Sequence, residues 1–229
     1  MSAVLLSACA TTIGGTALRH QSSGLQYVLP TADEVEQAVG NPLDPTGPPV
    51  VGAISLLPNG IRDSADVSPL ECLGAATPLM RVVYEQGDVR GVGLRDFTRY
   101  GEGQTVSSVH TGVVRFASDA EAARMFSTFV TRWLSCDNTA VVVNITADST
   151  LQWTVTDVRQ SGVILSATVF SGDTGGESDF PTEHAIGVAA DCIVDVDVAI
   201  TDMLPARRVA TTRAVDLVEQ MLDNIRRGA

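Results

Sequence analysis

The sequence predicts an α+β domain in which a central antiparallel sheet of about six strands has helices packed on one face. Three observations lead to this prediction. Apolar residues recur with a period of two in several segments, they recur with helical spacing in others, and short turn signals separate the strands. The expected order is helix, two strands, helix, four strands, helix. The 229 residues suit one domain of ordinary size with a tail.

The helices are expected where capping residues precede an amphipathic run. Residues 31–40 open with a Thr-x-x-Glu capping box and close at a glycine followed by Asn-Pro. Residues 118–136 open with Ser-x-x-Glu, and their apolar side chains share one helical face. A final amphipathic helix follows Pro205, with arginines in its last turn, where positive charge favours the helix dipole.

The strands are expected where apolar and polar residues alternate. Two early strands lie near residues 89–99 and 104–116, on either side of a Gly-Glu-Gly turn. The four later strands are expected around residues 141–146, 151–156, 163–169 and 192–200. Such alternation predicts an antiparallel sheet with one covered face and one wetter face.

Composition excludes several classes of function. The formal net charge is −12, and all 15 basic residues are arginines. An acidic chain without a basic stripe disfavours nucleic acid as a partner. No segment approaches the roughly 20 apolar residues that a membrane-spanning helix needs. The 45% hydrophobic content is that of a globular protein and excludes global disorder.

Common catalytic and metal-binding motifs are absent from the sequence. There is no Gly-x-Ser-x-Gly, no Ser-x-x-Lys, no His-Glu-x-x-His and no P-loop. The histidines His20, His110 and His184 are scattered, and no Cys-x-x-Cys accompanies them. We therefore expect no enzyme activity, no metal and no cofactor. His110 is expected to be a core or cleft histidine, and His184 a surface residue at the edge of a loop.

Two acidic features can be interpreted either as ordinary surface structure or as functional sites. Asp191, Asp195 and Asp197 lie on one strand face and could act as paired carboxylates, but a solvated sheet face is the preferred interpretation. The acidic stretch 171–183 is expected to be a flexible loop. It is either a mobile hairpin end or a lip over a binding cleft, with Phe180 as a contact residue.

The amino terminus carries a short apolar run that ends in cysteine. The run Val-Leu-Leu-Ser-Ala-Cys at residues 4–9 resembles the lipobox of bacterial lipoproteins, in which the cysteine is acylated. Only eight residues precede Cys9 and none is basic, so we expect residues 1–9 to be the remnant of a lipoprotein signal. A buried acyl chain would anchor the protein to the cell membrane. Residues 10–30 are expected to be a flexible tether, and residues 31–229 the folded domain.

An exported chain would keep its disulfides. Cys192 points with the apolar residues of its strand toward the expected helix layer, and Cys136 closes the helix expected there. We therefore expect a Cys136–Cys192 disulfide, which leaves Cys72 as a free thiol or an intermolecular link.

Three segments of the chain together carry a family resemblance. They are Pro69-Leu70-Glu71-Cys72-Leu73-Gly74 with Tyr84 downstream, Phe129 to Trp133-Leu134-Ser135-Cys136, and Ala190-Asp191-Cys192-Ile193-Val194-Asp195-Val196. In this order they resemble the extracellular sensor domain of mycobacterial PknH-like receptor kinases, a domain that also occurs alone in mycobacterial lipoproteins. The resemblance covers about residues 31–227.

The resemblance implies an α+β fold with a central antiparallel sheet and a sizeable cleft for an unidentified ligand. It also implies two disulfides. Cys136 and Cys192 match one pair, whereas Cys72 matches half of the other and its partner has no counterpart here. The family contributes no catalytic residues. Because this chain carries no kinase domain, any signalling would pass through another protein.

Three functions remain open from the sequence. The first is a lipid-anchored sensor domain at the cell envelope, with His110 and Phe180 as candidate cleft residues and an unknown small molecule, lipid or envelope protein as its ligand. The second is an adaptor whose cleft holds a segment of another protein. The third is an envelope hydrolase that uses His110 or the aspartate face.

Overall fold

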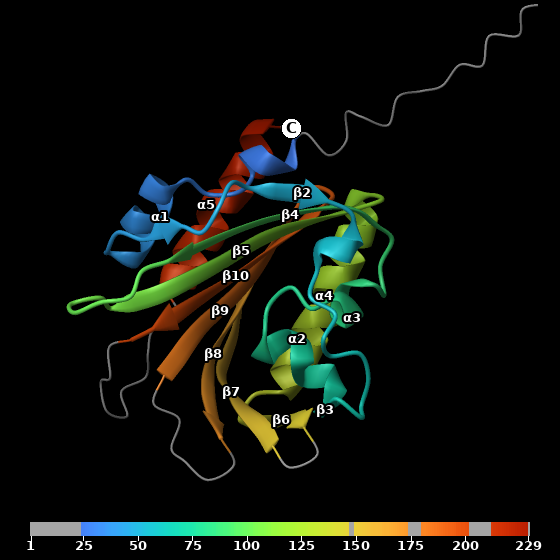
Figure 1. Cartoon of the computed structure of the whole chain (residues 1–229). Coiled ribbons are helices and arrows are strands. Elements are labelled where there is room, and N and C mark those ends of the chain that lie inside the picture. Colours follow the sequence, from blue (N-terminus) through green and yellow to red (C-terminus); the bar gives the residue numbers. More distant parts are fainter. Residues whose placement is uncertain (1–23, 147–148, 174–179, 202–211, 229) are drawn as a thin grey trace, which may run out of the picture.

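The computed structural model describes residues 24–146, 149–173, 180–201 and 212–228, and within them one antiparallel sheet of ten strands dominates (Figure 1). The strands are β1 (Asp44–Pro45), β2 (Val50–Gly52), β3 (Val67–Ser68), β4 (Val89–Thr98), β5 (Val106–Phe116), β6 (Thr139–Thr146), β7 (Ser149–Ser161), β8 (Ile164–Asp173), β9 (Phe180–Ala189) and β10 (Cys192–Ile200). Their order in the sheet is β1-β4-β5-β10-β9-β8-β7-β6-β3, and β2 pairs with β4.

Five α-helices and three short 3-10 helices accompany the sheet in the described part of the chain. The α-helices are α1 (Ala32–Val39), α2 (Leu73–Ala76), α3 (Arg81–Tyr84), α4 (Asp119–Ser135) and α5 (Thr212–Gly228). The 3-10 helices are η2 (Leu25–Tyr27), η3 (Ile54–Leu56) and η4 (Leu70–Cys72). Among the described residues, none of the helices has the length and apolar character that crossing a membrane requires.

The helix starts follow the capping residues expected from the sequence. Before α1, Thr31 accepts a hydrogen bond from the backbone N–H of Glu34, and the Glu34 carboxylate accepts one from the backbone N–H of Thr31. Gly40 ends this helix in the left-handed conformation, with φ of 81°. Before α4, Ser118 accepts from the backbone N–H of Glu121.

The sheet separates two hydrophobic cores, so the expectation of helices on one face is wrong. One core includes residues of α2, α3 and α4, such as Phe129, and the other includes residues of α1 and α5, such as Leu217. Figure 1 shows the two groups of helices on opposite sides of the sheet. In β10, Val194 and Val196 face the α5 side while Ile193 and Asp195 face the α4 side. Both faces of this strand are therefore covered.

The sheet has ten strands rather than about six. The long strand that the sequence pattern missed is β9, which contains proline, glutamate, histidine and glycine in place of a clean alternation. Its register with β8 and β10 is nonetheless continuous. Two of its polar residues, Glu183 and His184, are buried and hydrogen-bonded, which is how a polar sequence can form a central strand.

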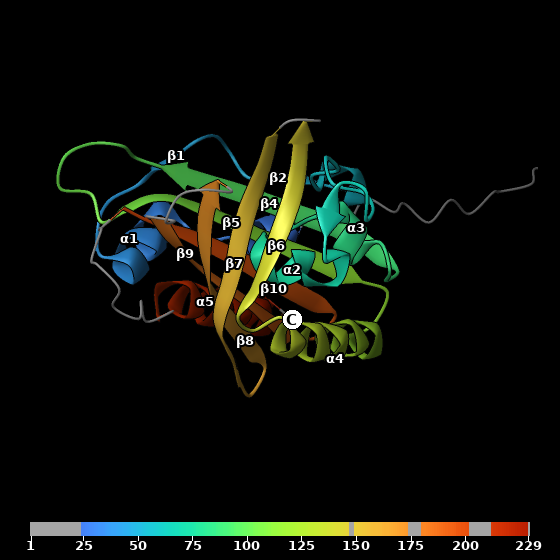
Figure 2. The same ribbon diagram turned by 90° about the horizontal axis from the view of Figure 1, so that it is seen from below.

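Strong twist brings the two ends of the sheet toward the same core. Figure 2 shows β6 and β7 running at a steep angle to β4 and β5. Val92 of β4 and Val141 of β6 both belong to the core that contains α4. The helices α2, α3 and α4 therefore pack against the concave face of a curved sheet.

The expected Cys136–Cys192 disulfide is wrong, because Cys72 pairs with Cys136 instead. The Cα atoms of this pair are 5.6 Å apart, and the bridge joins η4 to the end of α4. Cys192 is a buried free thiol in the core on the other face of the sheet. The sheet itself stands between Cys136 and Cys192, since α4 and the side chain of Cys192 occupy opposite faces.

The segment that precedes α1 takes part in the fold. Within the stretch expected to be a tether, Leu25, Val28 and Leu29 are buried in the core beneath α5. Cys9 and the rest of the lipobox-like run lie outside the described residues, as does the middle of the acidic stretch 171–183.

Candidate ligand-binding site

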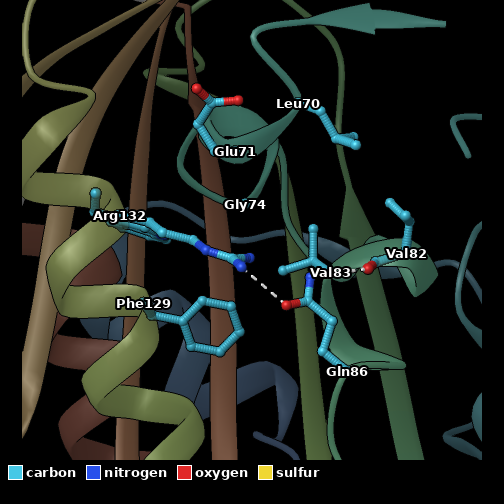
Figure 3. A pocket seen from close by; sticks show the side chains of 9 residues that line it. Leu70, Glu71, Gly74, Val82, Val83, Gln86, Phe129 and Arg132 are labelled. Atoms are coloured by element: carbon cyan, nitrogen blue, oxygen red, sulfur yellow. Dashed lines mark hydrogen bonds between the residues drawn. The ribbon is translucent and has the colours of Figure 1, made fainter. Parts of the chain in front are cut away.

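A pocket of about 210 Å³ lies where η4, α2 and α3 meet α4 (Figure 3). Its apolar walls come from all four elements, and its polar groups come from α4 and the segments facing it. The lining residues are Leu70, Glu71, Gly74, Val82, Val83, Gln86, Phe129, Arg132 and Trp133. The Cys72–Cys136 disulfide lies beside it and ties the η4 wall to the end of α4. The bridge therefore holds two sides of the pocket together.

Trp133 is a buried residue whose polar atom has no partner. Its side chain is 1% exposed, and its indole Nε1 forms no hydrogen bond within the described structure. This nitrogen is close to the Gly74 wall, because a Cβ added at Gly74 would stand 3.7 Å from it. An unsatisfied buried N–H is rare in folded proteins and calls for an explanation at the site it borders.

The polar groups of the pocket include an arginine that is only partly used. Arg132 Nη2 donates to Gln86 Oε1 across 2.9 Å, as Figure 3 shows. No salt bridge of Arg132 occurs among the described residues. Glu71 also lines the pocket, but its side chain is exposed and points away from Arg132.

Behind the pocket lies a buried ion pair between His184 of β9 and Asp195 of β10. His184 Nε2 is 2.8 Å from Asp195 Oδ1, and both side chains are almost fully buried. His184 Nδ1 is 3.0 Å from the carbonyl oxygen of Ala75 in α2, which can only accept a hydrogen bond. With a carboxylate on one nitrogen and a carbonyl on the other, both nitrogens donate and the ring is an imidazolium.

The carboxylate of Asp195 collects three hydrogen bonds. Besides His184, Asp195 Oδ2 accepts from the Tyr84 hydroxyl at 2.7 Å and from the Leu79 backbone N–H at 2.9 Å. Burial and the adjacent Asp195 raise the pKa of Tyr84 well above its usual value. Burial alone would lower the pKa of His184, but the charge and hydrogen bond of Asp195 outweigh it and raise that pKa. The ion pair thus attaches three segments to the sheet: α2 through Ala75, α3 through Tyr84, and the loop between them through Leu79.

Leu79 reaches this position through an unusual backbone. Its φ of 58° lies in the left-handed region, which costs energy for a residue with a side chain. Its side chain lies over Gly112 of β5, where an added Cβ would stand only 2.7 Å from Leu79 Cδ1. Because Gly112 has no side chain, the Leu79 side chain can pack against it while the Leu79 N–H donates to Asp195.

A row of alternating carboxylates and imidazoles crosses the same face of the sheet. The strand register places Asp96 opposite His110, His110 opposite Asp197, and Asp197 opposite His184. His110 Nδ1 is 3.2 Å from Asp96 Oδ1, and this hydrogen bond raises the pKa of His110. Burial raises the pKa of Asp197 to about 6, and its Oδ1 has no partner among the described residues.

The structure corrects several expectations about these residues. His184 is buried rather than on the surface, and Asp195 is 2% exposed rather than part of a solvated face. Asp191 precedes β10 and pairs with Arg115, apart from the other two aspartates. His110 is half exposed. Phe180 begins β9 opposite Ser171, and its side chain lies outside the described residues.

Both ring nitrogens of His184 have partners, one in the Ala75 carbonyl and the other in the Asp195 carboxylate. His110 Nδ1 lies 3.2 Å from Asp96 Oδ1, and the strand register places Asp197 opposite His110. Among the described residues, no group of three or more His, Cys, Asp and Glu side chains could hold a metal ion.

The pocket was not predicted from the sequence, although several of its residues lie in segments with a recognisable pattern. Phe129 and Trp133 belong to the apolar face expected for residues 118–136, and no catalytic or binding motif marks Arg132, Gln86 or Glu71. Residues of all three segments that carry the family resemblance meet at the pocket and at the ion pair behind it. The order of these three segments was the one feature of the sequence that pointed to the position of the pocket.

Comparison with known proteins agrees with this architecture. Residues 20–224 match the sequence model of the PknH-like extracellular domain family. The crystal structure of the extracellular domain of PknH from Mycobacterium tuberculosis superposes with a TM-score of 0.72 at 20% sequence identity, over 89% of this chain and 95% of that one.

A second solved structure, an uncharacterised protein from Mycobacterium smegmatis, matches with a TM-score of 0.41 at 12% identity, over 90% of this chain and 96% of that one. So low a score carries no argument about the fold. No curated protein sequence matches this chain. The family match spans most of the chain and the structural match confirms the fold. The chain belongs to the PknH-like extracellular domain family.

Proposed function

We propose that this chain is a lipid-anchored, non-catalytic sensor domain that binds a ligand in the Trp133 pocket on the outer side of the cell membrane. The observation that carries the proposal is a pocket of about 210 Å³ that is lined by Trp133, whose indole Nε1 is buried without an acceptor in the described structure. A bound molecule with an acceptor would satisfy it. Binding pockets combine apolar walls with a few such polar groups.

Family membership supports the placement outside the cytoplasm, since the family is one of extracellular domains. The lipobox-like run that ends at Cys9 supports an acyl anchor. The anchor is tested by metabolic labelling with palmitate in a mycobacterial host. We expect label on the wild-type chain and none on Cys9→Ala. Cys192→Ala is the matched control, because it removes another thiol and should keep the label. Equal labelling of Cys9→Ala would overturn the anchor.

Ligand binding is tested by thermal denaturation of the full chain with and without a cell-envelope extract. We expect the extract to raise the melting temperature of the wild type. Gly74→Ala should abolish the rise, because its Cβ would stand 3.0 Å from Val83 Cγ1 and 3.7 Å from Trp133 Nε1, which narrows the pocket. Gly60→Ala adds the same methyl group where no atom lies within 4 Å, and it should respond as the wild type does.

An equal response of Gly74→Ala and the wild type would place the ligand elsewhere, and no response of the wild type would remove the ligand-binding function. The size of the pocket also suits one side chain of a partner protein, which favours the adaptor as a second candidate. In that case crosslinking from intact membranes would capture a protein on the wild type and not on Gly74→Ala. A protein-free extract would then leave the melting temperature unchanged.

A further inference from the structure

We infer that the Trp133 pocket is selective for a small carboxylate with an apolar body the size of one ring or a short chain. The inference rests on the proposed function, because it names the ligand class for the same site. Three features carry it: the unpartnered indole N–H of Trp133, the partly used guanidinium of Arg132 in the same pocket lining, and the absence of an inward acidic group among the described lining residues.

The indole of Trp133 fixes what the ligand must offer. Nε1–H is a donor and can never accept, so only a ligand oxygen or another acceptor can satisfy it. Its side chain is 1% exposed and packs against His184, with ring centroids 4.6 Å apart. The ring is packed in place, and its nitrogen lies on the side of Gly74, where an added Cβ would stand 3.7 Å from it.

The positive charge of Arg132 favours a negatively charged acceptor. A guanidinium has five N–H donors, and the structure shows one of them in use, on Gln86 Oε1 at 2.9 Å. Gln86 in turn donates to the Val82 carbonyl at 3.4 Å, so its amide is oriented with the oxygen toward Arg132. A neutral amide leaves the positive charge of Arg132 uncompensated. Carboxylates bind guanidinium groups with paired, charge-assisted hydrogen bonds.

A cationic ligand is disfavoured by the same geometry. Glu71 is the acidic residue among the lining side chains, and it is exposed at the rim with its carboxylate turned away from Arg132 (Figure 3). A positive group would meet Arg132 without a counter-charge inside the pocket. The negative charge of Glu71 at the rim should slightly weaken the binding of an anion. Removing that charge is therefore expected to increase the affinity for an anionic ligand.

The apolar walls and the volume set the body of the ligand. Phe129, Val83, Val82 and Leu70 supply the apolar surface. A cavity of about 150 Å³ lined by aliphatic and aromatic residues is known to accept benzene. The 210 Å³ here accommodates one such ring with a short polar substituent.

Phenylacetate is therefore a suitable probe, with phenylacetamide and phenethylamine as its neutral and cationic counterparts. The chain has two tryptophans, so ¹⁵N-tryptophan labelling of the full chain gives two indole resonances, and Trp153→Phe identifies the one from Trp133. We expect phenylacetate to shift the Trp133 resonance and leave that of Trp153 in place. We expect it to bind about tenfold more tightly than the amide, and the amine to bind most weakly.

Variants then separate the role of each charge. Arg132→Gln should remove the preference for phenylacetate over phenylacetamide, whereas Glu71→Gln should increase the affinity for phenylacetate about twofold to threefold. Arg62→Gln is the matched control, since Arg62 is an exposed arginine paired with Asp66 and lies outside the pocket lining. Retention of two dispersed indole resonances shows that each variant is folded.

Equal affinity for the three probes, or a preference that survives Arg132→Gln, would overturn the inference and leave the proposed ligand-binding function intact. If none of the probes shifts the Trp133 resonance, the inference is also overturned. The extract experiment with Gly74→Ala and Gly60→Ala then decides the proposed function independently of the ligand class.

Discussion

The indole ring of Trp133 lies against the imidazole of His184, with 4.6 Å between the ring centroids and 47° between the ring planes. Through this contact the floor of the pocket rests on the buried ion pair that His184 forms with Asp195. The pair in turn holds Ala75 of α2 and Tyr84 of α3 to the sheet. The walls and floor of the pocket thus depend on the same set of buried hydrogen bonds.

The ion pair provides the first prediction. Asp195→Asn should lower the free energy of unfolding by about 3–5 kcal/mol, because it leaves the buried imidazolium of His184 without a counter-charge. Tyr84→Phe removes one hydrogen bond to the same carboxylate and should cost about 1–2 kcal/mol. Urea denaturation followed by circular dichroism measures both. Asp96→Asn, at a half-exposed carboxylate, serves as control, and a loss for Asp195→Asn no larger than that of the control would contradict the assignment.

The disulfide provides the second prediction. Peptide mapping of the oxidised chain after alkylation in denaturant should find Cys192 modified and Cys72 joined to Cys136. In the native state Cys192 should react slowly, because burial and the adjacent Asp191 raise its pKa to about 12. The double change Cys72→Ser with Cys136→Ser should cost about 2–4 kcal/mol of stability, since the bridge closes a separation of 64 residues. A mapped link between Cys136 and Cys192 would refute this pairing.

The row of carboxylates and imidazoles provides the third prediction, that the chain is more stable at pH 5 than at pH 8. Burial raises the pKa of Asp197 to about 6, and the pKa values of His110 and His184 are also raised. All three groups bind protons more tightly when the chain is folded. The contribution of Asp197 is complete below its unfolded pKa near 4 and is lost as the pH rises through about 6. The contributions of the histidines are present below about pH 6.5 and are lost above it.

Chemical denaturation at pH 5, 6, 7 and 8 measures this dependence. Asp197→Asn should flatten the part between pH 5 and 6, while His110→Asn should reduce the loss above pH 6.5. Glu121 acts in the opposite direction, because its hydrogen bonds with Arg124 and Asp88 lower its pKa to about 2, but its effect falls below pH 4.5 and outside this window. A stability that rises from pH 5 to pH 8 would show that these groups are not protonated more tightly in the folded chain.

The fourth prediction concerns the backbone of Leu79. Gly112→Ala should lower the stability by about 1–3 kcal/mol, because the new methyl group would overlap the Leu79 side chain and push its N–H away from Asp195. Gly60→Ala meets nothing within 4 Å and should change the stability by less than about 0.5 kcal/mol. Thermal unfolding compares the two variants. Similar melting temperatures for both would mean that Leu79 can move at no cost.

Local sequence signals predicted the elements that they control directly. The Thr31 and Ser118 caps and the period of two in β6, β7, β8 and β10 act within a few residues, so the corresponding helices and strands were predicted. The strand β9 was missed, because Glu183 and His184 belong in a buried strand only when α5 and β10 supply their partners. No pattern inside β9 reports on those partners.

The amino-acid sequence by itself determined the α+β class, the acidic and lysine-free composition and the family to which the chain belongs. These depend on local periodicity and on the order of short segments. Only the tertiary structure decided that helices cover both faces of the sheet, that Cys136 pairs with Cys72, and that Arg132 and Trp133 line a pocket together with Gly74 and Gln86. The physical reason is that burial and pairing depend on which face of a strand a distant helix covers, and alternation along one strand does not specify which helix that is.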